Sequence, residues 1–300
     1  MRQHVARQDD HTCYYFIADL HALTTVHEAK LMREYCLGVA LDYLAVGLDP
    51  DKVAFFRQSD VSEVTELTWI LSTVTPMGLL ERCHSYKDKL AKGVHPSHGL
   101  FAYPVLMAAD ILIYDANKVP VGKDQNQHLE VTRDIAMTFN HRYGDDVLVI
   151  PEAEVEAQTA VVPGFDGQKM SKSYNNAIEM FAPEKALKKS VMKIVTDSKS
   201  VEEPKDPEGN IAYELFRLMA SEAEVQEMAE NFRAGDYGYG TAKKALLEKI
   251  LDYFSAYRQR REELAGHPEE IEEILKRGAE KAREAASKTL DRVRKAVGIS

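Results

Sequence analysis

Hydrophobic and polar residues follow two different patterns along this chain. In the first half, short β-rich runs are bounded by polar or turn residues, as is typical of buried strands. These runs lie at 12–18, 53–56, 118–122 and 147–150. Between them, apolar residues recur at helical spacing near 27–46, 61–74, 78–90, 99–115 and 125–142. Strands that alternate with helices predict an α/β fold with a parallel, doubly wound sheet, in which ligands collect at the carboxyl ends of the strands.

The pattern changes near Pro183. Beyond this residue the strand-like runs vanish, and helical periodicity rich in Glu, Lys, Ala and Arg replaces them. We expect Thr241 to cap a long helix that runs to about Leu264, after which 266–268 breaks the chain before a final helix. The sequence therefore predicts an α/β domain over 1–182 that is followed by an all-helical domain over 183–300.

The composition is that of a folded chain with no sign of a membrane segment. Apolar residues make up 45% and charged residues 29% of 300 residues, which suits one or two domains. We find neither a stretch of eighteen uncharged apolar residues nor a signal peptide in the first twenty residues, and we expect a cytoplasmic protein. Cys13, Cys36 and Cys83 are odd in number and far apart, which argues against a disulfide framework and against a bound metal.

The net charge of −10 gives the chain as a whole no attraction for nucleic acid. One local patch is basic, because eight basic residues stand against three acidic ones between Lys276 and Lys295. Two interpretations stay open: a solvated helix face, which is the more common case, or a contact for RNA phosphates.

The strongest local signal is a pentapeptide with two lysines, Lys169-Met170-Ser171-Lys172-Ser173. Two ammonium groups three residues apart, on a loop with Gly164 and Gly167, can approach one polyphosphate together, and the serine hydroxyls add neutral donors. Lysines that meet the phosphates mainly in the transition state stabilise the charge on a departing pyrophosphate. We therefore expect Lys169 and Lys172 to be catalytic.

This pentapeptide resembles the second signature of the class I aminoacyl-tRNA synthetases, and the sequence around it resembles their tryptophanyl branch. Further segments that resemble this branch occur in the family's order at 16–24, 70–82, 103–136 and 194–198. The resemblance implies a Rossmann-like catalytic domain and a helical anticodon-binding domain. It also implies an ATP-dependent ligase that joins L-tryptophan to tRNA(Trp), with Mg²⁺ arriving on ATP, and a homodimer.

Three residues of the segment 103–110 share one face of a predicted helix, because Tyr103, Met107 and Asp110 are spaced by four and three. A carboxylate at the end of an apolar face can accept a hydrogen bond from a flat hydrophobic ligand, and an indole N–H is such a donor. The resemblance implies that Asp110 accepts this bond and that Met107 packs on the ring. Without it, a helix-surface carboxylate would be the simpler interpretation.

The resemblance implies further contacts with both substrates. Val119 and Val121 would form pocket walls, Tyr103 and Gln125 would hold the ammonium group, and His21 would line the pocket. The ATP site would comprise the following residues: Gly122, Lys123, Asp124, Val162, Lys89, Lys169, Met170, Ser171, Lys172 and Ser173.

Members of this family also carry a strand, a glycine-rich turn and a first signature ahead of the segment that resembles 16–24. Residues 1–5 of this chain resemble the helix that follows that signature. The sequence therefore predicts a parallel sheet without its first strand, which leaves unpaired backbone groups and an uncovered apolar face. A tyrosyl-tRNA synthetase and a non-catalytic binder of tryptophan or tRNA stay open as alternatives, although 107–110 and 119–128 favour tryptophan.

Overall fold

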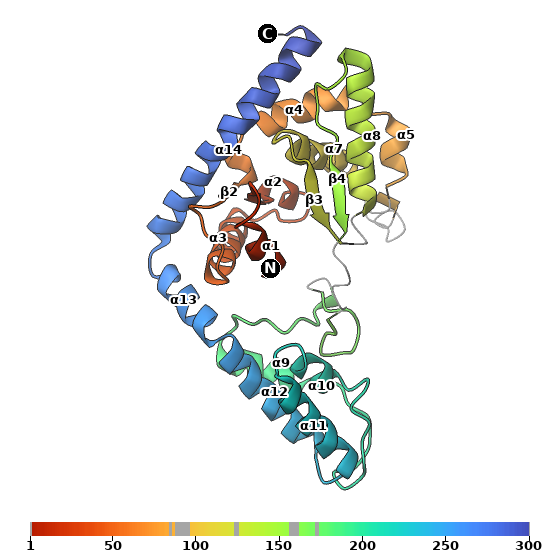
Figure 1. The fold of residues 1–300 in the computed structure, drawn as a ribbon, viewed down its shortest axis with the longest axis vertical. Coiled ribbons are helices and arrows are strands. Elements are labelled where there is room, and N and C mark those ends of the chain that lie inside the picture. The colour runs from red at the N-terminus through yellow and green to blue at the C-terminus, as the bar shows by residue number, and fades with distance from the viewer. Residues whose placement is uncertain are drawn as a thin grey trace. The chain divides into compact units, whose positions relative to one another are not determined.

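The computed structural model describes residues 2–83, 86–87, 97–122, 126–155, 162–171 and 174–299. The chain forms two compact units, of which the first contains Met1–Gln158 and Glu263–Ser300 and the second contains Thr159–Glu262 (Figure 1). The first unit thus includes the C-terminal segment, which the sequence analysis places in a helical domain beginning at residue 183. The assignment of substrate and anticodon binding to the two predicted domains stays a prediction.

The described residues of the first unit form four short strands in two parallel pairs. β1 (Tyr14–Ile17) pairs with β2 (Ala54–Arg57), and β3 (Lys118–Val121) pairs with β4 (Glu152–Val155). In these registers Tyr14 lies opposite Ala54 and Lys118 lies opposite Glu152. The parallel α/β fold predicted from the sequence is confirmed.

The strand predicted at 147–150 is wrong, because β4 begins only at Glu152. The side chain of Asn140 takes up both backbone groups of Leu148: Asn140 Nδ2 donates to the carbonyl oxygen at 2.8 Å, and the Leu148 N–H donates to Asn140 Oδ1 at 2.9 Å. A backbone N–H that is bound to a side chain in this way cannot donate to a neighbouring strand at the same time.

β1 and β3 have no second partner strand among the described residues. A hollow of about 330 Å³ is lined both by Tyr14, Tyr15 and Phe16 of β1 and by Val119 and other residues of β3. An additional parallel strand in this hollow would find backbone partners on both sides. The expectation of a sheet without its first strand stays a prediction.

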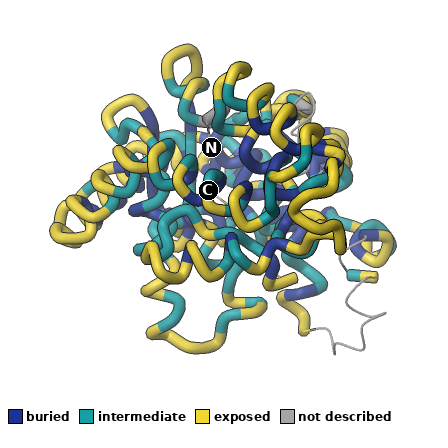
Figure 2. The backbone as a smooth tube through the Cα atoms, turned by 90° about the horizontal axis from the view of Figure 1, so that it is seen from below, coloured by how far each residue is buried: buried dark blue, intermediate teal, exposed yellow. Residues whose placement is uncertain are grey.

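Helices surround these strands. They are α1 (Arg2–Arg7), α2 (Asp19–Ala22), α3 (Ala29–Ala45), the 3₁₀ helix η1 (Gln58–Asp60), α4 (Glu63–Ser72), α5 (Met77–Glu81), α7 (His98–Leu112), α8 (Asn126–Tyr143) and α14 (Pro268–Val297). Among them, α3, α4, α7 and α8 confirm four of the predicted helical stretches with small shifts at their ends. Of the helix predicted near 78–90, the structure describes 78–83 and 86–87, and α5 ends at Glu81. Buried apolar residues from strands and helices form the core, including Phe56, Leu67 and Phe139. Figure 2 colours the buried positions along the backbone dark blue.

The second unit is helical around its own core. It contains α9 (Glu184–Met192), α10 (Ile211–Phe216), α11 (Glu222–Ala234) and α12 (Tyr239–Tyr253), and α13 (Ser255–Ala265) follows. Leu187, Phe232 and Leu246 are fully buried in this core. No strand is found among the described residues after Pro183, as predicted.

The single long helix predicted from Thr241 to Leu264 is wrong in two respects. Gly238, not Thr241, is the N-cap, since its extended backbone (φ −77°, ψ 150°) precedes the first helical residue. The helix then ends at Tyr253, because the backbone of Phe254 (φ −96°, ψ 4°) leaves the helical region before α13 begins.

Candidate active site

Asp110 lies inside the first unit, on α7. This helix is buried over most of its length, and only 3% of the Asp110 side chain is exposed. Burial raises the pKa of Asp110, whereas hydrogen bonds from His21 and Gln58 act in the opposite direction. The simpler interpretation of a helix-surface carboxylate is therefore wrong, and the side chain needs polar partners to stay charged.

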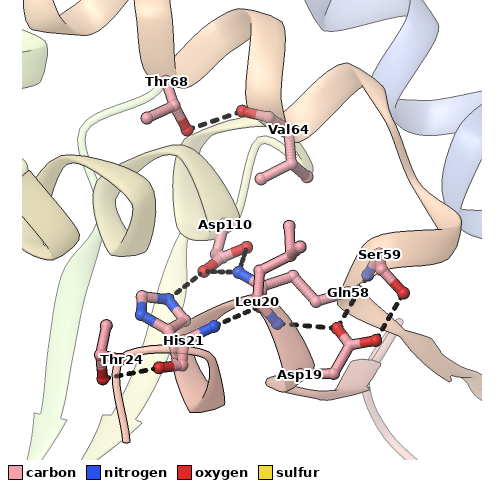
Figure 3. A network of polar contacts seen from close by, with 9 residues as sticks. All are labelled: Asp19, Leu20, His21, Thr24, Gln58, Ser59, Val64, Thr68 and Asp110. Carbon is pink, nitrogen blue, oxygen red and sulfur yellow. Dashed lines mark hydrogen bonds and ion pairs between the residues drawn. The ribbon is translucent and has the colours of Figure 1, made fainter. Parts of the chain in front are cut away.

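Those partners come from two other elements, and Figure 3 shows them converging on Asp110. His21 Nε2 of α2 lies 2.9 Å from Asp110 Oδ2. Gln58 Nε2 of η1 lies 2.8 Å from each of the two carboxylate oxygens. The carboxylate is thus held from two sides by side chains that are far apart in the sequence.

A second carboxylate fixes these two elements to each other. Asp19, the first residue of α2, accepts hydrogen bonds from the backbone N–H of Ser59 at 3.0 Å and from its hydroxyl group. Asp19 also accepts the backbone N–H of Leu20 at 2.9 Å. Because Ser59 follows Gln58 directly, these bonds set the distance between the residues that hold Asp110 (Figure 3).

A hollow of about 300 Å³ opens beside His21. Tyr103 contributes to its wall, with its ring edge-on to the imidazole at 6.0 Å between centroids, and its hydroxyl lies 3.0 Å from His128 Nε2. The full lining consists of Leu20, His21, Leu23, Thr24, Thr68, Ser97, Gly99, Ala102, Tyr103 and Leu106. A mostly apolar hollow with a few polar groups is typical of sites for small molecules.

The other predicted tryptophan contacts lie close to this network only in part. Met107 is half-buried on α7, between Tyr103 and Asp110 in the sequence. Val119 lines the hollow between β1 and β3, as Asp110 also does, and Val121 is buried at the end of β3. The structure thus brings His21, Tyr103 and Asp110 together, whereas Val119 shares a different hollow with Asp110.

The lysine loop lies in the second unit and doubles back on itself. Pro163 and Lys169 form an isolated antiparallel bridge, and the Met170 N–H donates to the Val162 carbonyl oxygen at 2.9 Å. Gly167 turns the chain with a φ of 84°, a conformation that favours glycine. Lys169 is exposed, as is Val162.

Asn176 holds the backbone of this loop on both sides of Met170. It is completely buried; its Nδ2 donates to the Lys169 carbonyl oxygen at 3.1 Å, and its Oδ1 accepts the Ser171 N–H at 2.7 Å. Nδ2 also donates to Asp166 Oδ1 at 2.8 Å. Asn176 thereby sets the path of the chain that carries Lys169.

Comparison with known proteins points to one family. The family described as tRNA synthetases class I (W and Y) matches residues 1–255. The tryptophan–tRNA ligase of Rhodopirellula baltica is 52% identical to this chain over 299 residues, and the match covers 100% of this chain and 93% of that protein. The tryptophan–tRNA ligase of Fusobacterium nucleatum subsp. nucleatum is 53% identical over 299 residues, and the match covers 100% of this chain and 92% of that protein. The chain belongs to the tryptophan–tRNA ligase family.

A solved structure from the same family agrees over nearly the whole chain. The tryptophanyl-tRNA synthetase of Campylobacter jejuni, complexed with ADP and tryptophan, matches with a TM-score of 0.95 and 46% identity. The match covers 99% of this chain and 93% of that one. This match confirms the Rossmann-like fold that the resemblance implied for this chain.

Several residues that the resemblance assigns to the ATP or tryptophan site lie outside the described residues. They are Lys89, Lys123, Asp124, Gln125, Lys172 and Ser173. Gly122 is described and is half-buried directly after β3. Within the described ranges, no group of three or more His, Cys, Asp or Glu side chains forms a metal site, and no helix is long and apolar enough to cross a membrane.

The basic residues of α14 are largely engaged within the first unit, which favours a structural role for this patch in the ligase. Arg292 Nη2 lies 2.5 Å from Asp115 Oδ1, and Arg294 contacts the Glu66 carboxylate with two nitrogens. Further contacts are Arg277 with Asp51, Arg283 with Glu63, Lys288 with Glu284, and Lys281 with the carbonyl oxygens of Pro50 and Asp51.

Sequence reasoning missed Gln58 and Asn176. Each is an amide that stands in a polar stretch without a periodic pattern, Gln58 in Arg-Gln-Ser-Asp and Asn176 in Tyr-Asn-Asn. One signal was available for Asn176, because it stands three residues after the end of the lysine pentapeptide. No signal in the sequence indicates that Gln58 lies against Asp110, 52 residues further along the chain.

Proposed function

We propose that this ligase activates L-tryptophan with ATP and then transfers it to tRNA(Trp), and that Asp110 accepts the indole N–H. The observation that carries the second part is the buried Asp110 carboxylate, which is held by Gln58 and by His21, and His21 itself lines a mostly apolar hollow. A buried acceptor that is left without a donor costs free energy. Amino-acid substrates whose side chain has no N–H to donate to Asp110 should therefore bind more weakly than tryptophan.

Asp110→Ala tests this assignment directly. The variant should lose tryptophan affinity while its ATP affinity stays nearly unchanged, because only the amino acid needs the acceptor. Calorimetric titration with each ligand measures both affinities. An equal loss of both would show that Asp110 is a structural residue.

Activation needs charge stabilisation rather than a side-chain nucleophile. The tryptophan carboxylate attacks the α-phosphorus of ATP, the bond to the bridging oxygen of pyrophosphate breaks, and pyrophosphate leaves with its charge. We assign the stabilisation of this charge to Lys169 and Lys172, with Ser171 and Ser173 as neutral donors. Mg²⁺ arrives on the phosphates, since it is held mainly by water and substrate oxygens.

The remaining ATP contacts are carried over from the family resemblance. Gly122 and Asp124, with Lys123 between them, would lie beside the ribose, and the Val162 backbone would meet adenine. Met170 belongs to the same loop, and Lys89 would add positive charge near the phosphates. The solved relative from Campylobacter jejuni binds ADP and tryptophan, which supports a nucleotide site in the family.

We also propose a cytoplasmic homodimer whose helical second region reads the anticodon. Support for the dimer comes from two large apolar side chains exposed in the first unit, Trp69 on α4 at 73% and Met77 on α5 at 63%. Apolar side chains that stand out to this extent on neighbouring helices are typical of a subunit interface.

Tryptophan-dependent exchange of pyrophosphate into ATP tests the reaction. The chain is compared with a version extended ahead of residue 1 by the first strand and signature of a relative, which would fill the hollow between β1 and β3. Exchange with tryptophan but not with tyrosine, in at least the extended version, supports the proposal. Exchange with tyrosine instead would indicate a tyrosyl-tRNA synthetase, and silence of both versions would indicate a non-catalytic binder.

A further inference from the structure

Gln58 contacts the Asp110 carboxylate and not the hollow in which tryptophan is proposed to bind. It is 1% exposed and does not line the hollow beside His21. Its Oε1 accepts the backbone N–H of His21 at 3.4 Å, and an N–H offers only a hydrogen to such a partner. The amide is therefore oriented with its Nε2 towards Asp110, where it donates to both oxygens at 2.8 Å.

A double donor of this kind favours the charged form of a buried carboxylate. An ionised carboxylate accepts on both oxygens, whereas a protonated one must donate with one of them and would direct a hydrogen towards the Gln58 NH₂ group. His21 supports the same form from the other side when Nε2 carries the hydrogen. The ionised carboxylate has about four acceptor positions, so that one is left for an indole N–H.

We propose that Gln58 is a positioning residue for specificity, which keeps Asp110 ionised and aimed so that it accepts the indole N–H. This inference rests on the proposed role of Asp110. Gln58 itself touches no substrate in it and acts only through the carboxylate. The anchor of η1 to α2 through Asp19 and Ser59 keeps Gln58 at the required distance.

Loss of Gln58 leaves a nearly fully buried carboxylate with one side-chain donor instead of two. Burial raises the pKa of Asp110, and the negative charge of Asp19 acts in the same direction, whereas the Gln58 and His21 bonds lower it. The neighbouring Tyr114 on the C-terminal side of α7 stays neutral, because burial and the charge of Asp110 raise the pKa of its hydroxyl. Loss of Gln58 removes one of the two side-chain bonds that lower the pKa of Asp110, so that this pKa is expected to rise further and the protonated form to gain population.

Gln58→Met tests the inference because it removes the amide and keeps its volume. The affinities for tryptophan and for its analogue with sulfur in place of the indole nitrogen are measured by calorimetry on the full chain. At pH 7 we expect roughly 10–100-fold weaker binding of tryptophan. The affinity for the sulfur analogue, which has no N–H to donate, should change by less than about threefold.

Asn140→Leu is the matched control. Asn140 is also a buried amide with two hydrogen bonds, but both go to Leu148, away from Asp110. This variant should lose stability and keep the preference for tryptophan over the sulfur analogue. A similar loss of preference in both variants would show that Gln58 has only a structural role.

The pH dependence gives a second readout. In Gln58→Met, tryptophan affinity should recover as the pH rises, because Asp110 then loses its proton and becomes an acceptor again. His21→Gln in the same background keeps a side-chain N–H donor near the position of Nε2 and carries no ionisable group, and the recovery should persist. A loss of affinity in Gln58→Met that is equal at all pH values would overturn the inference.

Asp110→Ala separates the two levels of the argument. If this variant keeps the preference for tryptophan over the sulfur analogue, the proposed role of Asp110 is wrong. If Asp110→Ala loses the preference but Gln58→Met keeps it, Asp110 is the acceptor and only the role of Gln58 is wrong.

Discussion

Gly278 of α14 lies directly against the backbone of Phe55 in β2. A Cβ atom at Gly278 would stand 1.9 Å from the Phe55 carbonyl oxygen, closer than any real contact. In an isolated helix, glycine at this position would only cost stability relative to alanine. Here the missing side chain lets the longest helix of the first unit pack on the strand that leads to Gln58.

Gly278→Ala should therefore destabilise the protein although alanine is the better helix former. Relieving the clash requires a shift of α14 or β2, which we expect to lower the free energy of unfolding by about 1–3 kcal/mol. Urea unfolding measures this change.

Gly38→Ala is the control for this substitution. Gly38 lies within α3 of the same unit, and a Cβ there would meet nothing within 4 Å. We expect this variant to gain about 0.5–1 kcal/mol of stability. A neutral or stabilising Gly278→Ala would show that α14 packs less closely on β2 than the structure indicates.

The ion pair of Glu66 with Arg294 makes the docking of α14 dependent on pH. The hydrogen bonds from Arg294 hold the pKa of Glu66 below its ordinary value of 4.5. A carboxylate with a lowered folded-state pKa stabilises the fold above its ordinary value, and this stabilisation is lost as the pH falls through the lowered pKa. The pair therefore strengthens the fold at neutral pH and not in acid.

Glu66→Gln should accordingly lower the melting temperature at pH 7 and make little difference at pH 3. Thermal unfolding monitored by circular dichroism at both pH values measures this. Glu284→Gln is a suitable control, because Glu284 pairs with Lys288 four residues later on the same helix, and among the described residues no hydrogen bond or ion pair ties Glu284 to a second element. An equal effect of both substitutions would contradict a docking role for Arg294.

The sequence predicts those features that depend on regular spacing. Tyr103, Met107 and Asp110 fall on one helix face because a helix repeats every 3.6 residues, and the parallel strands follow from the alternation of strands and helices. The same reasoning failed for 147–150. The apolar residues there are typical of a strand, but the Asn140 side chain of α8 forms hydrogen bonds with the N–H and the carbonyl oxygen of Leu148. It also could not show that Gly278 meets Phe55, since close approach is a tertiary property.

Charge along the sequence has the same limit. The basic stretch from Lys276 to Lys295 is compatible with RNA or with solvent, and only the fold shows that Glu66 and Asp115 lie within reach of it. Gln58 is a similar case, because its partner is 52 residues away. Contacts between distant segments are set by packing, which no local pattern encodes.

Asn176→Ala should slow the activation step without weakening tryptophan binding. The Asn176 amide holds the Lys169 carbonyl oxygen and the Ser171 N–H, so that its loss frees the backbone that positions the lysine. We expect kcat for pyrophosphate exchange to fall on the order of 10-fold or more, with KM for tryptophan nearly unchanged. The exchange assay is run on the version of the chain in which activity is found.

Asn231→Ala serves as the control in the same unit, because Asn231 is exposed on α11 and contacts neither Lys169 nor Ser171 in the described structure. It should leave both kinetic constants unchanged. If Asn176→Ala raises KM for tryptophan and leaves kcat as it is, the loop contributes to amino-acid binding instead.

Trp69 offers a direct test of the proposed homodimer. It is the chain's single tryptophan, and 73% of it is exposed on α4, although indole is among the side chains most enriched at subunit interfaces. Trp69→Glu places a charge on this surface and should convert a dimer to a monomer in sedimentation velocity. Leu218→Glu adds the same charge at a residue that is 47% exposed on the second unit, and it should leave the dimer intact.

In the unaltered chain, dilution below the dissociation constant of the dimer should expose Trp69, so that acrylamide quenches its fluorescence more strongly. A dimer that persists in Trp69→Glu would move the interface to another face of the first unit.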